Sequence, residues 1–269
     1  MMTKALLENI NSIPPLPESV QEVEKVYQNP DSTFEDMEKV IKKDPLLTAS
    51  ILRIANSPMY GVKSTIGDVK RAISLLGKDS VRTFVLQSAV DANFEIALSP
   101  YNMTKENFSL ACDKQLALTI NWLIRRQPKR LSVMGPAAFL VDLGRVVISK
   151  TLKEDGKEDI IQKALLAGED ITQAEKTACG AQTTDVTATL FHNWNLDPNV
   201  IHIIRYSDDP DGTYEEEKEM AAELKVIRET VNPNGEITDE SIATAKDTIE
   251  EYELDLKSYE RALERVMYP

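Results

Sequence analysis

The sequence predicts an all-α protein, and three observations support this prediction. Apolar residues recur at helical spacing in nearly every segment of the 269-residue chain. No segment shows the alternation of apolar and polar residues that is typical of a strand, and no hairpin signal is flanked by β-branched runs. The clearest helix also carries its own start and stop signals: Asp44 suits the N-cap, Pro45 suits the first helical position, and residues 56–58, Asn-Ser-Pro, end it.

The other expected helices are each marked by an apolar stripe. A proline-rich segment at residues 13–17 precedes the first of them, Ser32 or Thr33 can cap the second, and Gly77 ends another. In chain order the stripes are Val20, Val23, Val26 and Tyr27; Met37, Val40 and Ile41; Leu47, Ile51, Ile54 and Ala55; Val69, Ile73 and Leu76; Val81, Phe84, Val85 and Ser88; Leu116, Thr119, Ile120, Leu123 and Ile124; Val186, Leu190 and Trp194; Val200, Ile203 and Ile204; and Met220, Ala221, Leu224 and Ile227.

Composition indicates a globular protein. Hydrophobic residues make up 42% and charged residues 28% of the chain, which excludes the disordered class. No apolar run reaches the eighteen or so residues that a membrane helix needs, and residues 1–8 become charged too soon for a secretory signal. The two cysteines, Cys112 and Cys179, lie in helical patterns and are expected to be reduced and buried. We therefore expect a cytoplasmic protein without a membrane partner.

The negative charge of the chain is concentrated near its end. The net charge is −13, and residues 207–269 hold nineteen acidic against seven basic residues, whereas residues 1–206 hold twenty-five against twenty-four. The composition changes at residues 207–212, Ser-Asp-Asp-Pro-Asp-Gly, which suits a hinge. We therefore expect a domain at 1–206 and an acidic helical extension at 207–269, packed on or next to it. Acidic surfaces repel phosphates, so nucleic acid is not an expected partner.

Three motifs in order identify a resemblance. They are Ile-Pro-Pro-Leu-Pro at 13–17, the block from Asp44 to Gly61, and Ala-Ile-Ser-Leu-Leu-Gly at 72–77. These residues resemble the HDOD family, the output-domain relatives of the HD metal phosphohydrolases. The resemblance continues to Trp-Asn-Leu at 194–196, so it covers about residues 10–206. It implies a helical, HD-like orthogonal bundle, here with additional C-terminal helices.

The resemblance also implies where a metal site would lie in an HD phosphohydrolase, and this sequence departs from it. Residues 138–147 resemble the family helix "LLHDIGRLV", with Val141 at the histidine position and Asp142, Gly144 and Arg145 retained. Other histidine positions fall at about Lys114, near Thr183, and at 205–208, Arg-Tyr-Ser-Asp. The chain has two histidines in all, so we expect a degenerate site without metal or cofactor.

The charged residues of this degenerate site allow two pairings. Asp142 and Arg145 are three residues apart and can form an ion pair on one helix face. The ammonium of Lys114 can also neutralise Asp142. His192 and His202 fall where the family has no ligands, so we expect them to be surface or half-buried residues.

Two functions follow from these observations. The resemblance implies a bacterial signalling module, which we expect to be non-enzymatic and to act by contact with another signalling protein. Its candidate contact surfaces are the proline-rich segment (Pro14, Pro15, Leu16 and Pro17) and the turn with Asn56, Ser57 and Tyr60. Alternatively, these residues have structural roles: the proline-rich segment fixes the start of a core helix, and the turn with Asn56, Ser57 and Tyr60 ends one. The second function is a metal-dependent phosphohydrolase or a nucleotide-binding sensor with a rearranged pocket around Asp142; at least three converging carboxylates or histidines would favour the enzyme.

Overall fold

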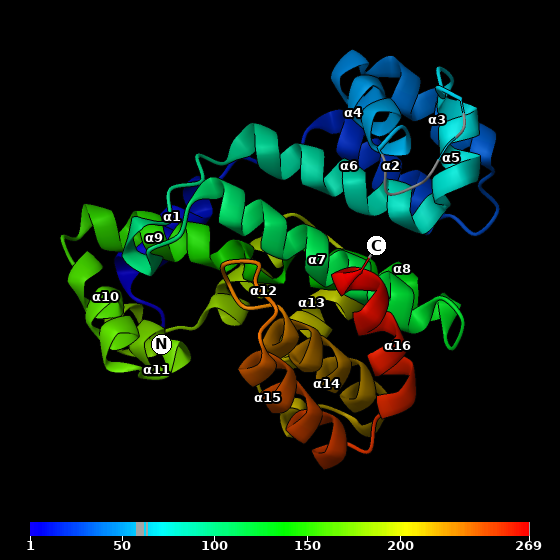
Figure 1. The fold of residues 1–269 in the computed structure, drawn as a ribbon. Coiled ribbons are helices and arrows are strands. Elements are labelled where there is room, and N and C mark those ends of the chain that lie inside the picture. Colours follow the sequence, from blue (N-terminus) through cyan, green and yellow to red (C-terminus); the bar gives the residue numbers. More distant parts are fainter. Residues whose placement is uncertain (58–61, 63, 269) are drawn as a thin grey trace. The chain divides into compact units, whose positions relative to one another are not determined.

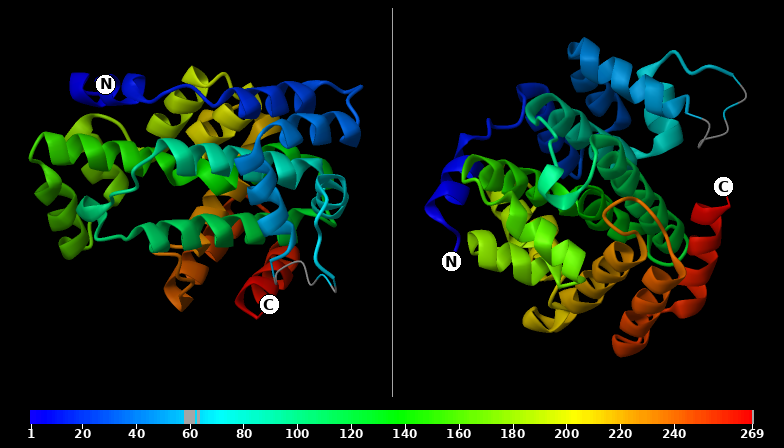
Figure 2. Two further views of the ribbon diagram at one scale, coloured as in Figure 1. Left: turned by 90° about the horizontal axis from the view of Figure 1, so that it is seen from above. Right: turned by 60° about the vertical axis from the view of Figure 1, so that its left-hand side comes forward.

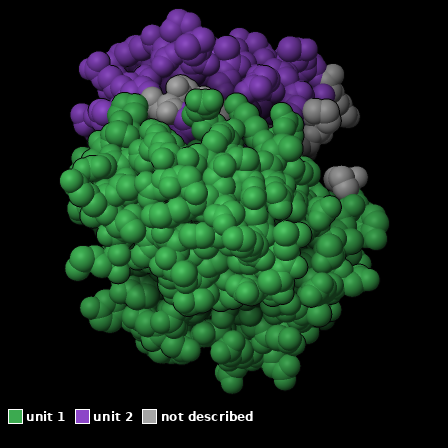
Figure 3. All heavy atoms as spheres, turned by 90° about the vertical axis from the view of Figure 1, so that its left-hand side faces the viewer, with its two compact units in different colours: residues 1–14, 95–269 green, residues 15–94 purple. Residues whose placement is uncertain are grey.

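The computed structural model describes residues 1–57, 62 and 64–268. Over these residues the secondary structure is helical, without a β-strand, which confirms the predicted all-α class (Figure 1). The chain forms two compact units, one of residues 15–94 and one of residues 1–14 together with 95–269 (Figure 3).

The smaller unit consists of five helices in its described residues: α2 (Glu18–Gln28), α3 (Phe34–Lys43), α4 (Pro45–Ala55), α5 (Val69–Leu76) and α6 (Lys78–Asn93). Helix α4 begins as the sequence predicts, because Asp44 Oδ1 accepts the backbone amides of Leu46 at 2.9 Å and Leu47 at 3.1 Å. A buried ion pair also joins α2 to α6. Arg82 Nε and Nη2 donate to the two carboxylate oxygens of Glu24 at 2.8 and 2.9 Å.

The larger unit contains the remaining helices. In chain order they are α1 (Lys4–Ser12), η2 (Ser99–Tyr101), α7 (Lys105–Leu123), η3 (Pro128–Arg130), α8 (Leu131–Leu140), η4 (Val141–Leu143), α9 (Gly144–Glu154), α10 (Glu158–Ala167), α11 (Ile171–Cys179), α12 (Thr183–Asn193), α13 (Pro198–Tyr206), η5 (Pro210–Gly212), α14 (Glu215–Thr230), α15 (Asp239–Glu251) and α16 (Leu256–Met267). Helix α8 and the helices around it form the core of this unit.

One helical segment, Pro128–Glu154, is long and apolar enough to cross a membrane by length and composition. Its most apolar stretch is 89% buried inside the protein, so the apolar composition is explained by packing in the core. Asp142 and Arg145 interrupt this stretch, which is why the sequence shows no unbroken apolar run there.

The acidic C-terminal region packs on the helices that precede it. Helices α14 and α15 lie side by side, and α16 lies along α7 (Figures 1 and 2). Trp122 on α7 donates from Nε1 to Ser258 Oγ at 2.9 Å. The basic cluster at 125–130 contributes as well, because Arg126 and Arg130 both pair with Glu223, whose side chain is fully buried. Residues 207–269 therefore belong to the same compact unit as 95–206, and the units divide at 14/15 and 94/95.

Candidate functional site

Asp142 is the centre of a buried charged cluster in the larger unit. It lies in η4, between α8 and α9, and is 4% exposed. Its Oδ2 accepts a hydrogen bond from Gln115 Nε2 on α7 at 2.9 Å. Its Oδ1 lies 3.4 Å from Arg145 Nη2 and 3.5 Å from Arg228 Nη2. The ion pair predicted from the spacing of Asp142 and Arg145 is present, and a second arginine joins it.

Arg228 connects this cluster to the C-terminal region. It lies on α14, and its guanidinium also pairs with Asp208, which accepts a hydrogen bond from Thr184 Oγ1 at 2.7 Å. One guanidinium thus bridges two carboxylates from segments separated by more than sixty residues. The division predicted at residue 206 separated Arg228 from the site, so sequence reasoning missed it.

A second buried carboxylate, Glu175 on α11, lies near Arg145. It is 2% exposed and accepts hydrogen bonds from the Tyr101 hydroxyl at 2.8 Å, the Thr183 hydroxyl at 2.7 Å and the Thr183 amide at 2.6 Å. The guanidinium of Arg145 lies 5.8 Å from the centre of the Tyr101 ring. Burial raises the pKa of Glu175, although Arg145 and these hydrogen bonds oppose the shift.

The pKa shifts of Asp142, Asp208 and Arg228 all favour the charged forms of these residues. Burial alone would raise the pKa of Asp142, but Arg145, Arg228 and the Gln115 hydrogen bond together lower it below its usual range. The pKa of Asp208 is lowered against burial in the same way, chiefly by Arg228. Burial opposes the charge of Arg228, yet the two aspartates raise its pKa. These shifts favour the ionised forms of Asp142 and Asp208 beside the charged guanidinium of Arg228.

The retained glycine of this region has a packing role. The amide of Gly144 donates to Thr187 Oγ1 at 2.8 Å, and the same hydroxyl donates to the carbonyl of Val141 at 2.8 Å. A Cβ at Gly144 would lie 2.2 Å from the carbonyl oxygen of Thr183. Helices α9 and α12 therefore approach too closely for any side chain at this position. Val141 and Thr183 are both buried in this contact.

Lys114 does not take part in the cluster. Its ammonium donates to the carbonyl of Gly235 at 2.7 Å and forms no ion pair with Asp142. The neighbouring residue, Gln115, faces Asp142 instead. The sequence suggested that Lys114 could neutralise Asp142, and in the structure Arg145 and Arg228 pair with this carboxylate instead.

The side chains present do not suit a metal ion. Across the described part of the chain, no three His, Cys, Asp or Glu residues converge as a ligand group. The polar atoms left without a partner on the residues that bind Asp142 are Nε and Nη1 of Arg145, Nε of Arg228 and Oε1 of Gln115. The N–H donors of these guanidinium groups repel a metal cation, and one amide oxygen does not hold one. His192 is exposed, and the half-buried His202 contacts Glu217 at 2.7 Å, as expected for residues outside a metal site.

Three of the seven candidate contact residues have internal roles. The carbonyl of Pro14 accepts a hydrogen bond from Trp194 Nε1 at 3.0 Å, and Leu16 is buried. Asn56 binds the carbonyl and amide of Ile66 at 2.8 and 2.7 Å, so it fixes the chain after α4. Pro15 is exposed, Pro17 and Ser57 are half-buried, and Tyr60 lies outside the described residues.

A helical bundle with Asp142, Gly144 and Arg145 at its centre has the plan of an HD-type fold. The sequence matches the HDOD domain over residues 13–210. The chain therefore belongs to the HDOD family, as its motifs indicate. The matched range ends close to the boundary predicted at 206.

Comparisons with individual proteins agree with the fold. An uncharacterised protein of Treponema pallidum (strain Nichols) is 21% identical over 243 residues. The match covers 86% of this chain but 44% of that protein, so the chain spans less than half the length of this curated relative. A putative phosphohydrolase from Shewanella amazonensis has a TM-score of 0.74 at 23% identity, covering 98% and 94% of the two chains. A putative signal transduction protein from Marinobacter aquaeolei has a TM-score of 0.75 at 19% identity, covering 98% and 63%.

Proposed function

We propose that this chain is a non-enzymatic regulatory module of bacterial signalling, which acts in the cytoplasm through contact with another protein. The observation that carries the proposal is the state of Asp142. The one carboxylate retained at the HD position is 4% exposed and is bound by two guanidinium groups. It is therefore neither open to a substrate nor free to bind a metal ion.

The alternatives receive less support from the same geometry. A phosphohydrolase needs a metal or a nucleophile beside the substrate, and a nucleotide sensor around Asp142 needs room for a base and a phosphate. The cluster is filled by side chains from α7, α9 and α14, and both Asp142 and Arg145 are buried. The name of the Marinobacter relative points to signalling, which agrees with the proposal.

The proposal is tested by assaying the purified chain for hydrolysis of p-nitrophenyl phosphate, bis-p-nitrophenyl phosphate and cyclic dinucleotides, with Mn²⁺, Fe²⁺ or Zn²⁺ added. We expect no turnover above a matched Asp142→Asn variant. In parallel, the tagged chain is crosslinked in its native cells, and a partner protein should be recovered at a fixed stoichiometry. Metal-dependent hydrolysis that disappears in Asp142→Asn would contradict the proposal.

A further inference from the structure

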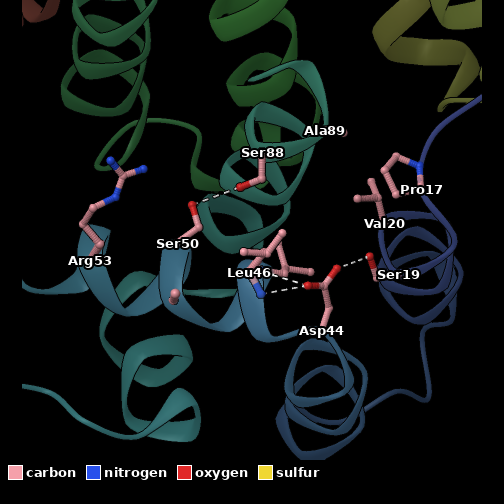
Figure 4. A pocket seen from close by; sticks show the side chains of 11 residues that line it. Pro17, Ser19, Val20, Asp44, Leu46, Ser50, Arg53, Ser88 and Ala89 are labelled. Atoms are coloured by element: carbon pink, nitrogen blue, oxygen red, sulfur yellow. Dashed lines mark hydrogen bonds between the residues drawn. The ribbon is translucent and has the colours of Figure 1, made fainter. Parts of the chain in front are cut away.

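The smaller unit has a surface groove that the degenerate HD site does not explain. It has a volume of about 610 Å³ and is lined by side chains of α2, α4 and α6 and by residues just before α2 and α4 (Figure 4). Val20, Leu46 and Leu47 give it apolar walls, and Ala49 and Ala89 keep it open. All of its lining residues lie within 15–94.

Helix α4 presents two different faces. Leu47, Ile51 and Ala55 are buried on one of them. The other carries Leu46, Ala49, Ser50 and Arg53, which all line the groove and are spaced at i, i+3, i+4 and i+7. Leu46 is 84% exposed, although it is a large apolar residue. This face therefore combines an uncovered apolar side chain at one end with a cation at the other.

Arg53 is the charged residue of the block at 44–61 that the fold does not use. Asp44 in the same block accepts the amides that begin α4 and the Ser19 hydroxyl at 2.7 Å, so its carboxylate is already engaged. Asn56 holds the chain at Ile66. Arg53 is exposed and, among the described residues, makes no hydrogen bond or ion pair. Its guanidinium is free to bind an anionic group.

We propose that this groove docks an acidic, amphipathic helix of the partner protein, with an apolar side chain on Leu46 and a carboxylate paired with Arg53. These two anchors are seven positions apart on α4, which is about 10.5 Å along the helix axis. A partner helix lying along α4 must therefore carry its apolar residue and its carboxylate seven positions apart. The hydroxyls of Ser50 and Ser88, 3.0 Å apart, offer a polar contact between the anchors. This inference rests on the proposed function, because it assumes action by protein contact.

A pair of designed peptides tests the proposal directly. Both are helical and about eighteen residues long, with a leucine and, seven positions away, either glutamate or lysine. Fluorescence anisotropy with the full chain should show that the glutamate peptide binds about tenfold more tightly, which corresponds to about 1.4 kcal/mol. Arg53→Glu should reverse this preference. Arg71→Glu, which changes an exposed arginine of the same unit outside the groove, should leave it unchanged.

The apolar anchor has its own control. Leu46→Ala should weaken both peptides, whereas Leu75→Ala, at another exposed leucine of the same unit, should not. Equal affinity of the wild type for the two peptides, a preference that survives Arg53→Glu, or no binding up to about 1 mM would overturn the inference. Self-association of the chain that is lost in Arg53→Glu would overturn it in favour of a second copy as the occupant. These results are independent of the hydrolysis assay, so the groove can fail while the proposed function stands.

Discussion

Replacing Arg228 by methionine should be among the most damaging single changes in the larger unit. Methionine keeps a long unbranched side chain but removes the guanidinium that bridges Asp142 and Asp208. Asp142 is then left buried with Arg145 as its remaining cation, and Asp208 loses its arginine partner. Removing one partner of a buried ion pair costs about 3–5 kcal/mol, because the other charge stays out of water.

This loss of unfolding free energy can be expressed as a decrease in melting temperature. The larger unit comprises residues 1–14 and 95–269. At about 2.1 cal/mol/K per residue, its unfolding entropy is about 0.4 kcal/mol/K, so the melting temperature should fall by about 8–12 °C. Scanning calorimetry of the full chain measures this shift. Lys246→Met, which removes an exposed ion pair with Glu260, is the matched control and should shift it by less than about 2 °C.

The pH dependence separates a lost charge from lost packing. The folded-state pKa values of Asp142 and Asp208 are lowered, so their contribution to stability is complete above the unfolded value of about 3.9 and is lost as pH falls through the folded values. In Arg228→Met this contribution is already missing. The difference in melting temperature between Arg228→Met and the wild type should therefore become smaller as the pH falls below about 4. A melting temperature within about 2 °C of the wild type at pH 7, or a gap that acid does not narrow, would refute this reasoning.

Three further predictions follow from single contacts. Gly144→Ala should destabilise the larger unit by about 3 kcal/mol in urea unfolding, because its Cβ meets the Thr183 carbonyl, whereas Gly67→Ala should be tolerated since that position is open. Glu24→Ala should lower the stability of the smaller unit by about 3–5 kcal/mol, seen as a separate shift in calorimetry, because the buried guanidinium of Arg82 loses both of its hydrogen bonds to the Glu24 carboxylate. Burial raises the pKa of the Cys112 thiol well above its usual value and that of Cys179 to about 11, so Ellman's reagent at pH 8 should label neither thiol in the folded chain and both after denaturation.

Local features of the fold could be predicted from the sequence because neighbouring residues determine them. The start of α4 at Asp44 and Pro45 is one example, and the ion pair of Asp142 with Arg145 is another. Both depend on residues within one helical turn. The position expected at about Lys114 differs by one residue, because Gln115 faces Asp142 and a shift of one residue turns a side chain by about 100° around its helix.

The rest of the cluster depends on tertiary contacts that periodicity does not encode. Arg228 reaches Asp142 across 86 residues. It lies on α14, in the region that we expected to be an acidic extension packed on or next to the domain at 1–206. Glu175 carried a weak signal, an acid between Ala174 and Ala178 on a short helix, but its partners Tyr101 and Thr183 come from other elements. The sequence therefore indicates that the HD position is altered, and the structure shows which side chains bind Asp142.

The central claim is that guanidinium groups, and no metal ion, neutralise the carboxylate at the HD position. The most direct test is the metal content of untagged protein purified from cells grown with iron, manganese and zinc, measured by plasma mass spectrometry. We expect far less than one equivalent of any of these metals, and the same value in Asp142→Ala. A stoichiometric metal that is lost in Asp142→Ala would contradict the account.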